Sequence, residues 1–219
     1  MTRKSAAERR KDLIEAGLRV IAREGIHGAT VRAIVAEAGV PLATFHYVFH
    51  SRDEMIGEAY AYVVLPDPDA QEPHLPADAT LPDVIRALLQ HWVDRLAARP
   101  EFELAIMEIM AYCRRLPELE HLPGEVQDRY VQAVSGLIEA ACERTGVHPA
   151  RPLAEIATLV LHVSDGVTYH LLRTRDEDAA RSFVDEAAPM LAAAMQRSAP
   201  PSGSPSAAAQ SAAAAGAAR

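Results

Sequence analysis

Apolar residues recur every three or four positions along most of the chain, which is the period of an amphipathic helix. The first such face consists of Leu13, Ala16, Gly17, Val20 and Ile21. Gly25 is expected close to the end of this helix. No stretch alternates apolar and polar residues as a half-buried strand would. The pattern predicts an all-α fold with about nine helices.

Two short helices are predicted on either side of a Gly-Val-Pro break. Thr30 can cap the first, and Gly39 can stop it by taking a backbone conformation that other residues resist. Pro41 suits the first turn of the second, where a missing N–H costs nothing. A fourth helix is expected from Ser51, since acidic residues follow in its first turn and are favoured there by the helix dipole.

The short helix after Pro41 has two chemically different sides. Phe45 and Phe49 fall on the same side at about 100° per residue, and their packing must hold a helix too short to be stable alone. The opposite arc carries Ala43, Thr44, His46 and Tyr47. These side chains are small or form hydrogen bonds, which suits the floor of a DNA major groove. Two helices joined by a glycine-containing turn, the second polar on its outer side, form the helix-turn-helix pattern.

The rest of the chain reads as long helices after a proline-rich segment. Five prolines in residues 66–82 predict a long surface loop. Thr80 and Asp83 then form a capping pattern ahead of an apolar stripe that runs to Pro100. Further helices are expected over residues 101–115, 124–145, 153–173 and 176–196. The Ala, Ser and Pro-rich tail from residue 198 has no large apolar groups to bury, so we expect it to be disordered.

Composition and charge narrow the function classes. The 219 residues are 49% hydrophobic and 24% charged, which is typical of a globular protein. No window approaches the roughly 18 apolar residues of a membrane helix and the start lacks a signal peptide, so a cytoplasmic protein without a membrane partner is expected. The net charge is −8, yet residues 1–57 sum to +2 and the remainder to −10. A polyanion would therefore meet the N-terminal end. The two cysteines, Cys113 and Cys142, predict small buried apolar groups and not a disulfide framework.

The run TVRAIVAEAGVPLATFHYVFHSRDE, residues 30–54, resembles the DNA-binding domain of TetR-family transcriptional repressors. The similarity lies in the Thr that opens a helix, the Ala-Gly-Val turn, the Thr before an aromatic cluster that ends in Phe, and the Ser-basic-acid start of the next helix. It spans about residues 8–60. The sequence departs from the usual pattern at Pro41, at Ala43 and at His46-Tyr47-Val48. A weaker similarity at Asp165-Gly166 matches the next-to-last helix of the family, which helps to form the dimer.

The resemblance implies which residues face DNA. It places Thr30 and Arg52 at helix N-termini near phosphates. The residues implied to meet the duplex are Arg32, Leu42, Ala43, Thr44, His46 and Tyr47. The chemistry agrees, because arginine pairs bidentately with guanine and helix N-termini bind phosphate oxygens. His46 can equally be an inert packing residue.

The resemblance also implies a division of labour along the chain. Residues 1–57 would form the helix-turn-helix DNA-binding domain, residues 58–197 a helical domain for ligand binding and dimerisation, and residues 198–219 a disordered tail. The family forms homodimers through its last two helices. Here an apolar face that includes Ala187, Leu191 and Met195 could pair across a two-fold axis or belong to the intrachain core.

A small-molecule site would combine apolar bulk with a few polar groups. The candidates in the helical domain are Trp92, Phe102, Met107, Met110, Tyr112, Tyr130, His162 and Tyr169. Each of them alone is more often a core residue than a ligand contact. Their mixture of apolar and aromatic side chains predicts a lipophilic or aromatic inducer.

The sequence gives little support for a metal-binding or enzymatic function. His46 and His50 are four residues apart and could share a metal, but no Glu stands between them and no third ligand is evident, so no metal site is expected. No cofactor is expected, and the motifs of common enzyme classes are absent from the sequence. The sequence predicts a ligand-responsive, homodimeric transcriptional regulator, most simply a repressor, on a palindromic DNA operator. The alternative is a helical small-molecule or protein-binding module that does not bind DNA.

Overall fold

The computed structural model describes residues 5–62 and 75–196, and these form nine α-helices and no strand. The helices are α1 (Ala6–Gly28), α2 (Val31–Ala38), α3 (Leu42–Val48), α4 (Arg52–Tyr62), α5 (Leu81–Ala98), α6 (Pro100–Cys113), α7 (Leu122–Thr145), α8 (Leu153–Thr174) and α9 (Glu177–Gln196). The all-α prediction is confirmed. The expected disordered tail, and residues 66–74 of the expected loop, lie outside the described residues.

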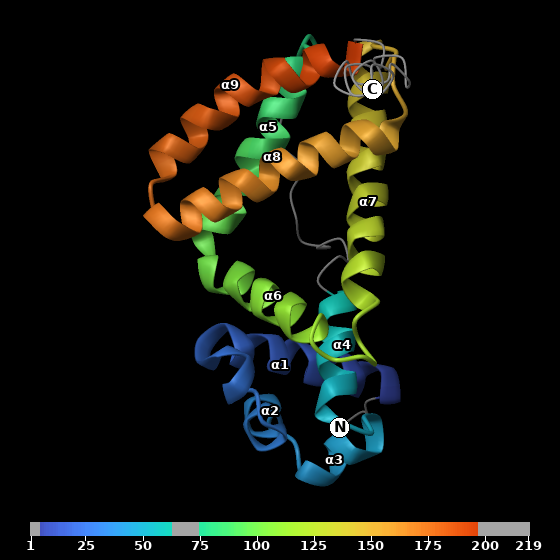
Figure 1. Cartoon of the computed structure of the whole chain (residues 1–219), viewed down its shortest axis with the longest axis vertical. Helices are drawn as coiled ribbons and strands as arrows, with labels where there is room; N and C mark the ends of the chain where they lie inside the picture. The colour runs from blue at the N-terminus through green and yellow to red at the C-terminus, as the bar shows by residue number, and fades with distance from the viewer. Residues whose placement is uncertain (1–4, 63–74, 197–219) are drawn as a thin grey trace, which may run out of the picture.

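The chain folds as a lower group of helices, α1 to α4, and an upper group, α5 and α7 to α9 (Figure 1). Helix α6 lies across the boundary above α1, and α7 runs from the upper group down toward α4 (Figure 1). No helix within residues 5–62 and 75–196 has the length and apolar character needed to cross a membrane.

Local signals set the helix ends in the lower group. Helix α1 changes direction at Gly25, whose φ of 75° lies in the left-handed region. Thr30 caps α2, as predicted, by accepting a hydrogen bond from the Ala33 N–H at 3.2 Å. Gly39 ends α2 in the left-handed conformation, with φ of 66°. Pro41 differs slightly from expectation: it is the extended residue before α3 and not part of its first turn.

The two phenylalanines of the short helix are its anchor, as the sequence indicated. Phe45 and Phe49 are fully buried, with ring centroids 5.5 Å apart. Arg10 of α1 reinforces this anchor, since its guanidinium lies 4.5 Å from the centroid of Phe49 and donates to the Val48 carbonyl oxygen at 2.9 Å. The same guanidinium pairs with Glu54 and Glu58 of α4. A helix of seven residues is thereby fixed in position by burial and by contacts to α1 and α4.

Two clusters of buried side chains form the cores. The lower cluster joins α1 to α4 with the inward side of α6, including Cys113. The upper cluster joins α5 to α7, α8 and α9, including Cys142. Both cysteines are free and buried, as expected from the sequence. Helix α6 therefore belongs by its packing to the lower group, although it follows α5 in the chain.

One sequence interpretation of the last helix is resolved by this core. Ala187, Leu191 and Met195 of α9 are buried within the chain, in the upper cluster. This face packs on its own chain and leaves no surface there for a second copy. The intrachain alternative is the correct one for these residues.

Candidate functional site

The outer side of α3 is open to solvent. Tyr47 is 72% exposed and Leu42 is 43% exposed, although both are large. Ala43 and His46 are also exposed, and Thr44 is partly exposed. The buried Phe45 and Phe49 hold the opposite side, so the side chains named from the sequence lie on the accessible face of a fixed helix.

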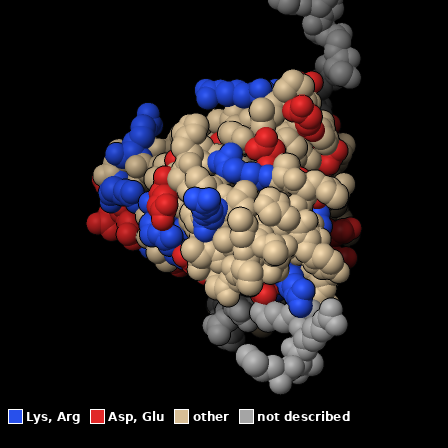
Figure 2. Space-filling view, turned by 90° about the horizontal axis from the view of Figure 1, so that it is seen from below, with Lys and Arg blue, Asp and Glu red and all other residues tan. Residues whose placement is uncertain are grey.

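The charges around α3 are unevenly available. Seen from the α3 end of the molecule, a broad uncharged area adjoins Lys and Arg side chains that gather toward one side, with acidic groups beside them (Figure 2). Arg19 and Arg23 both pair with Glu37 of α2, at 2.8 and 3.2 Å. Arg32 is exposed and makes no hydrogen bond or ion pair within the described residues. Of these arginines, Arg32 is the one whose guanidinium has no competing partner there.

Arg52 departs from the group predicted to meet DNA. Its guanidinium turns into the protein, where Nε donates to the Ala29 carbonyl oxygen at 2.6 Å and Nη2 donates to the Ile26 carbonyl oxygen. Its Nη1 donates to the Tyr112 hydroxyl at 3.1 Å. The carbonyls at the end of α1 are satisfied by this side chain. Arg52 thus acts as a structural link, and its guanidinium is not displayed beside Thr30, which is exposed as predicted.

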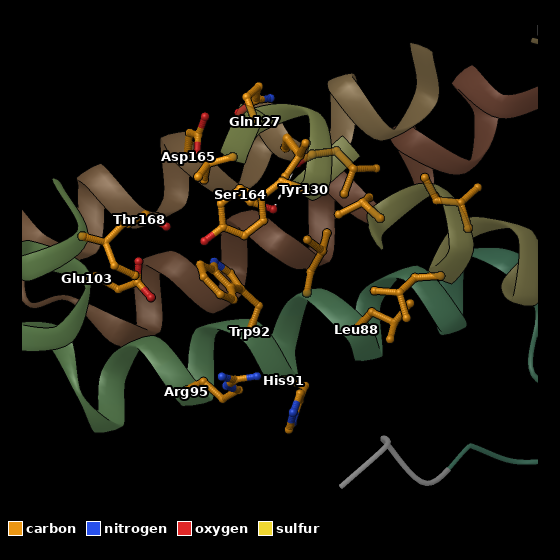
Figure 3. A pocket seen from close by; sticks show the side chains of 18 of the residues that line it. Leu88, His91, Trp92, Arg95, Glu103, Gln127, Tyr130, Ser164, Asp165 and Thr168 are labelled. Carbon is orange, nitrogen blue, oxygen red and sulfur yellow. Dashed lines mark hydrogen bonds between the residues drawn. The ribbon is translucent and has the colours of Figure 1, made fainter. Parts of the chain in front are cut away.

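A cavity of about 540 Å³ lies among α4 to α9. Five of the predicted ligand residues line it: Trp92, Met107, Met110, Tyr130 and Tyr169. Figure 3 shows Trp92 of α5 and Tyr130 of α7 facing one another across it. The volume and the largely apolar, aromatic wall are those of a small-molecule site.

Three predicted ligand residues lie elsewhere. Phe102 packs against the lower core beneath the Arg99 guanidinium, and His162 is exposed on α8. Tyr112 points to the lower group, where its hydroxyl donates to Asp53 at 2.7 Å and accepts from Arg52. Their chemical type suits a ligand site, but the fold turns them away from the cavity wall.

The cavity is also lined by polar residues that are not among the candidates predicted from the sequence. Glu103 of α6, Asp165 of α8 and Tyr60 of α4 line it, with Thr168 and Gln127 (Figure 3). Burial raises the pKa of the Glu103 carboxyl; Arg95 acts against this shift, and Asp165 adds to it. Burial likewise raises the pKa of Asp165, against the influence of His162. Glu103 is three and four residues before Ile106 and Met107, which also line the cavity, so an acid at helical spacing from apolar residues is the signal that could have found it.

Trp92 has an unsatisfied polar atom at this site. Its Nε1 is buried and has no hydrogen-bond partner among the described residues. A buried donor without a partner costs free energy, so a bound molecule with an acceptor would remove that cost.

An apolar strip on the outside of α9 remains uncovered. Met190 is 69% exposed and Phe183, two turns earlier, is 52% exposed. Large apolar side chains gathered on one outer face are typical of a protein interface.

A helix-turn-helix unit with a displayed third helix, joined to a helical bundle with a ligand-sized cavity, defines the class of ligand-responsive DNA-binding regulators. The sequence model described as bacterial regulatory proteins, tetR family, matches residues 13–59. The chain is 30% identical over 144 residues to the HTH-type nicotine-responsive transcriptional repressor HdnoR of Paenarthrobacter nicotinovorans, covering 64% of this chain and 72% of that protein. The chain belongs to the TetR family of transcriptional regulators.

Other proteins similar to this chain are also transcriptional regulators or share its fold. The uncharacterised HTH-type regulator YfiR of Bacillus subtilis is 24% identical over 87% of this chain and 93% of its own length. A TetR regulator from Haloarcula marismortui has a TM-score of 0.65 at 18% identity, with 87% of this chain and all of that chain covered. The multidrug binding protein EbrR, solved with imidazole, has a TM-score of 0.52 at 25% identity over 81% of this chain and 93% of that one. The alternative of a module without DNA binding is not favoured by these relatives.

Proposed function

We propose that the protein is a repressor that binds a palindromic DNA operator as a homodimer and leaves it when a small molecule fills the cavity. The DNA-binding part of this proposal is supported by the geometry of α3. Phe45 and Phe49 are buried, and Tyr47, Leu42 and His46 are open to solvent. A rigid helix with one free face is what major-groove recognition requires.

Each displayed residue has a chemical role in this proposal. Thr44 and Tyr47 offer hydroxyls to base edges or phosphates, and Ala43 and Leu42 offer apolar contact to a thymine methyl. Arg32 on α2 supplies a positive charge, and the exposed N-terminus of α2 at Thr30 supplies backbone donors for a phosphate. His46 is included because it is exposed on the same face. Arg52 keeps only the structural role described above.

The domain division follows the same proposal, with one refinement. Residues 1–57 bind DNA and residues 58–197 bind ligand and dimerise, but the boundary at residue 57 falls within α4 (Arg52–Tyr62). Tyr60, near the end of that helix, lines the cavity. One helix therefore touches both functions.

The homodimer places the exposed strip of Phe183 and Met190 against the same strip of a second copy. Such an isologous contact suits two-fold symmetry and gives two α3 helices for two half-sites of a palindrome. As a regulator of transcription it works where bacterial DNA lies, in the cytoplasm. The family is generally non-enzymatic, and no catalytic role is proposed.

The ligand proposal rests on the cavity and its aromatic wall. HdnoR is named as nicotine-responsive and EbrR as a multidrug binding protein, which supports a lipophilic or aromatic small molecule here as well. Binding relieves repression if it favours a dimer whose α3 helices no longer match successive major grooves.

Selection of bound sequences from a random pool of double-stranded DNA tests the proposal directly, and we expect a palindrome. Tyr47→Ala and Thr44→Ala should then each weaken operator binding by about tenfold, the scale of one lost base contact, without altering the helical circular dichroism. Thr174→Ala, at an exposed threonine near the end of α8, is the matched control and should leave operator binding unchanged. Unselective binding, or full operator affinity in both α3 variants, would contradict the assignment of α3.

A further inference from the structure

The cavity wall holds two acidic side chains that its apolar packing does not explain. Glu103 comes from α6 and Asp165 from α8, and Asp165 lies close enough to raise the pKa of Glu103. Burial of a carboxylate is costly unless a positive group or hydrogen bonds compensate. No hydrogen bond to the Glu103 carboxylate is found within the described residues. Such groups at a cavity indicate a function and not a packing role.

Aromatic rings surround these acids. Trp92, Tyr130, Tyr60 and Tyr169 line the same cavity, from four different helices. In Figure 3 Glu103, Trp92 and Tyr130 lie around one common space, with Asp165 above them. The face of an aromatic ring attracts a cation, most strongly when water is excluded. The carboxylates and the aromatic ring faces of this cavity therefore both attract a positively charged ligand.

We propose, building on the proposed ligand-binding role of the cavity, that its ligand is a hydrophobic organic cation. The positive group lies near Glu103 and Asp165, and the apolar body contacts the aromatic wall. An acceptor atom on the ligand would also satisfy the buried Nε1 of Trp92. A neutral hydrocarbon would leave the acids uncompensated, and an anion would be repelled by them.

The basic groups of the wall do not reverse this selection. Arg95 and His91 of α5 also line the cavity. In Figure 3 their side chains are drawn farther from Tyr130 than the Trp92 ring is. Arg95 lowers the pKa of Glu103, yet burial and Asp165 keep that pKa raised. The carboxylate at Glu103 is therefore not fully compensated by the protein.

The chain supplies its own probe for this proposal. Trp92 is the only tryptophan among the 219 residues, so its fluorescence reports binding in the cavity directly. We would titrate the full chain with tetraphenylphosphonium, with the similarly shaped anion tetraphenylborate and with neutral triphenylphosphine oxide. Tetraphenylphosphonium should bind about tenfold or more tightly than either of the others, the scale of one partly screened charge contact.

Glu103→Gln separates charge from shape. It should weaken tetraphenylphosphonium binding by about tenfold and leave triphenylphosphine oxide binding within about twofold of the unmodified chain. Asp165→Asn should act in the same direction and more weakly, since Asp165 is more exposed. Glu101→Gln is the matched control, because Glu101 is an exposed acid two residues away on α6 and does not line the cavity. It should change nothing.

The outcomes separate the two proposals. If triphenylphosphine oxide or tetraphenylborate quenches Trp92 as well as the cation does, or if Glu103→Gln keeps the full preference for the cation, the charge assignment is overturned and the cavity stays a ligand site. If no probe reaches Trp92, the cavity itself is overturned as a site for lipophilic molecules. Operator binding by the ligand-free protein is measured separately and is untouched by either result.

Discussion

Glu108 accepts a hydrogen bond from the backbone N–H of Ile26 at 2.6 Å, and so joins α6 to the point where α1 changes direction. Gly25, next to Ile26, has a positive φ, and a Cβ there would come within 3.2 Å of the Glu108 carboxylate. Met107 and Met110 of the same helix line the cavity. Helix α6 therefore contacts both the cavity and the DNA-binding part.

This geometry predicts how a bound ligand is felt at the DNA. Glu108→Gln should leave ligand affinity unchanged but reduce the factor by which tetraphenylphosphonium weakens operator binding, because a charge-assisted bond to α1 is lost. The coupling between two such sites is typically 1–3 kcal/mol, and a loss of about half of it is measurable as a several-fold change. The readout is the operator Kd with and without saturating tetraphenylphosphonium.

Glu118→Gln, at an exposed acid outside α6, is the control and should preserve the coupling. A Glu108→Gln variant that releases DNA as readily as the unmodified protein would show that the ligand acts through another contact. Tyr60 on α4 would then be the next residue to test.

The anchor of α3 should matter for stability and for DNA binding together. Phe49→Ala removes a fully buried ring that also lies under Arg10, so we expect a loss of about 3–5 kcal/mol in the free energy of unfolding. Operator affinity should fall with it because α3 loses its fixed position. Leu42→Ala, at an exposed residue of the same helix, should cost less than about 0.5 kcal/mol. Denaturant unfolding followed by circular dichroism measures both.

The anchor was predictable and the inner network was not, for a physical reason. Phe45 and Phe49 are four residues apart, which places them on one side of a helix, and Thr30 and Gly39 are helix-cap signals. Each of these features depends only on residues close by in the sequence. The bonds of Arg52 reach Ile26 and Tyr112, far away in the sequence. No local pattern records such a contact.

Some residues of the cavity were likewise predictable from the sequence and others were not. Five of the eight candidate ligand residues line it, because aromatic and methionine side chains on bundle helices are common in such walls. Helix rotation decides the rest: Tyr112 is two residues beyond Met110 on α6, and this offset turns it toward Asp53. The acids of the cavity escaped notice because chemical type alone does not distinguish Glu103 from the many exposed acids.

Salt dependence separates the two arginines named from the sequence. Arg32→Ala should lower operator affinity and reduce the slope of log affinity against log salt by about 1, because one phosphate-neutralising charge is lost. Arg52→Ala should leave that slope unchanged and lower the stability instead, since its guanidinium serves Ala29 and Ile26. Binding titrations at several salt concentrations measure the slope. An equal slope change in both variants would mean that Arg52 also reaches the DNA.

The exposed strip on α9 predicts the oligomeric state. Met190→Glu together with Phe183→Glu should convert the dimer to a monomer, because charges at the centre of an apolar interface lose their water. Leu104→Glu, at a similarly exposed apolar residue on α6, should stay dimeric. Sedimentation velocity distinguishes the two masses. A double variant that remains dimeric would show that the interface lies on another face. A monomeric variant that binds the palindromic operator with full affinity would show that DNA binding does not require the dimer.

The pH dependence of cation binding tests Glu103 in its protonation state. Burial raises the pKa of this carboxyl above its ordinary value of 4.5, with Arg95 opposing and Asp165 adding to the shift. A protonated carboxyl carries no charge to attract a cation, so affinity for tetraphenylphosphonium should be weak below the raised pKa and increase as the pH rises through it. The probe does not titrate, so the change belongs to the protein.

Other ionisable groups lie at or near the cavity, and the Glu103→Gln variant accounts for them. His91 and Arg95 of α5, Asp165 of α8, Tyr130 of α7 and Tyr60 of α4 line the cavity and remain in that variant, as does His162 beside Asp165. The part of the pH profile due to Glu103 is therefore the difference between the two titrations of Trp92 fluorescence. The two affinities should converge at low pH, where Glu103 is neutral, and separate by about tenfold at neutral pH, where only the unmodified chain has the extra charge. Parallel profiles at every pH would mean that Glu103 acts through its shape, and the attraction of a cation would then have to come from the ring faces alone.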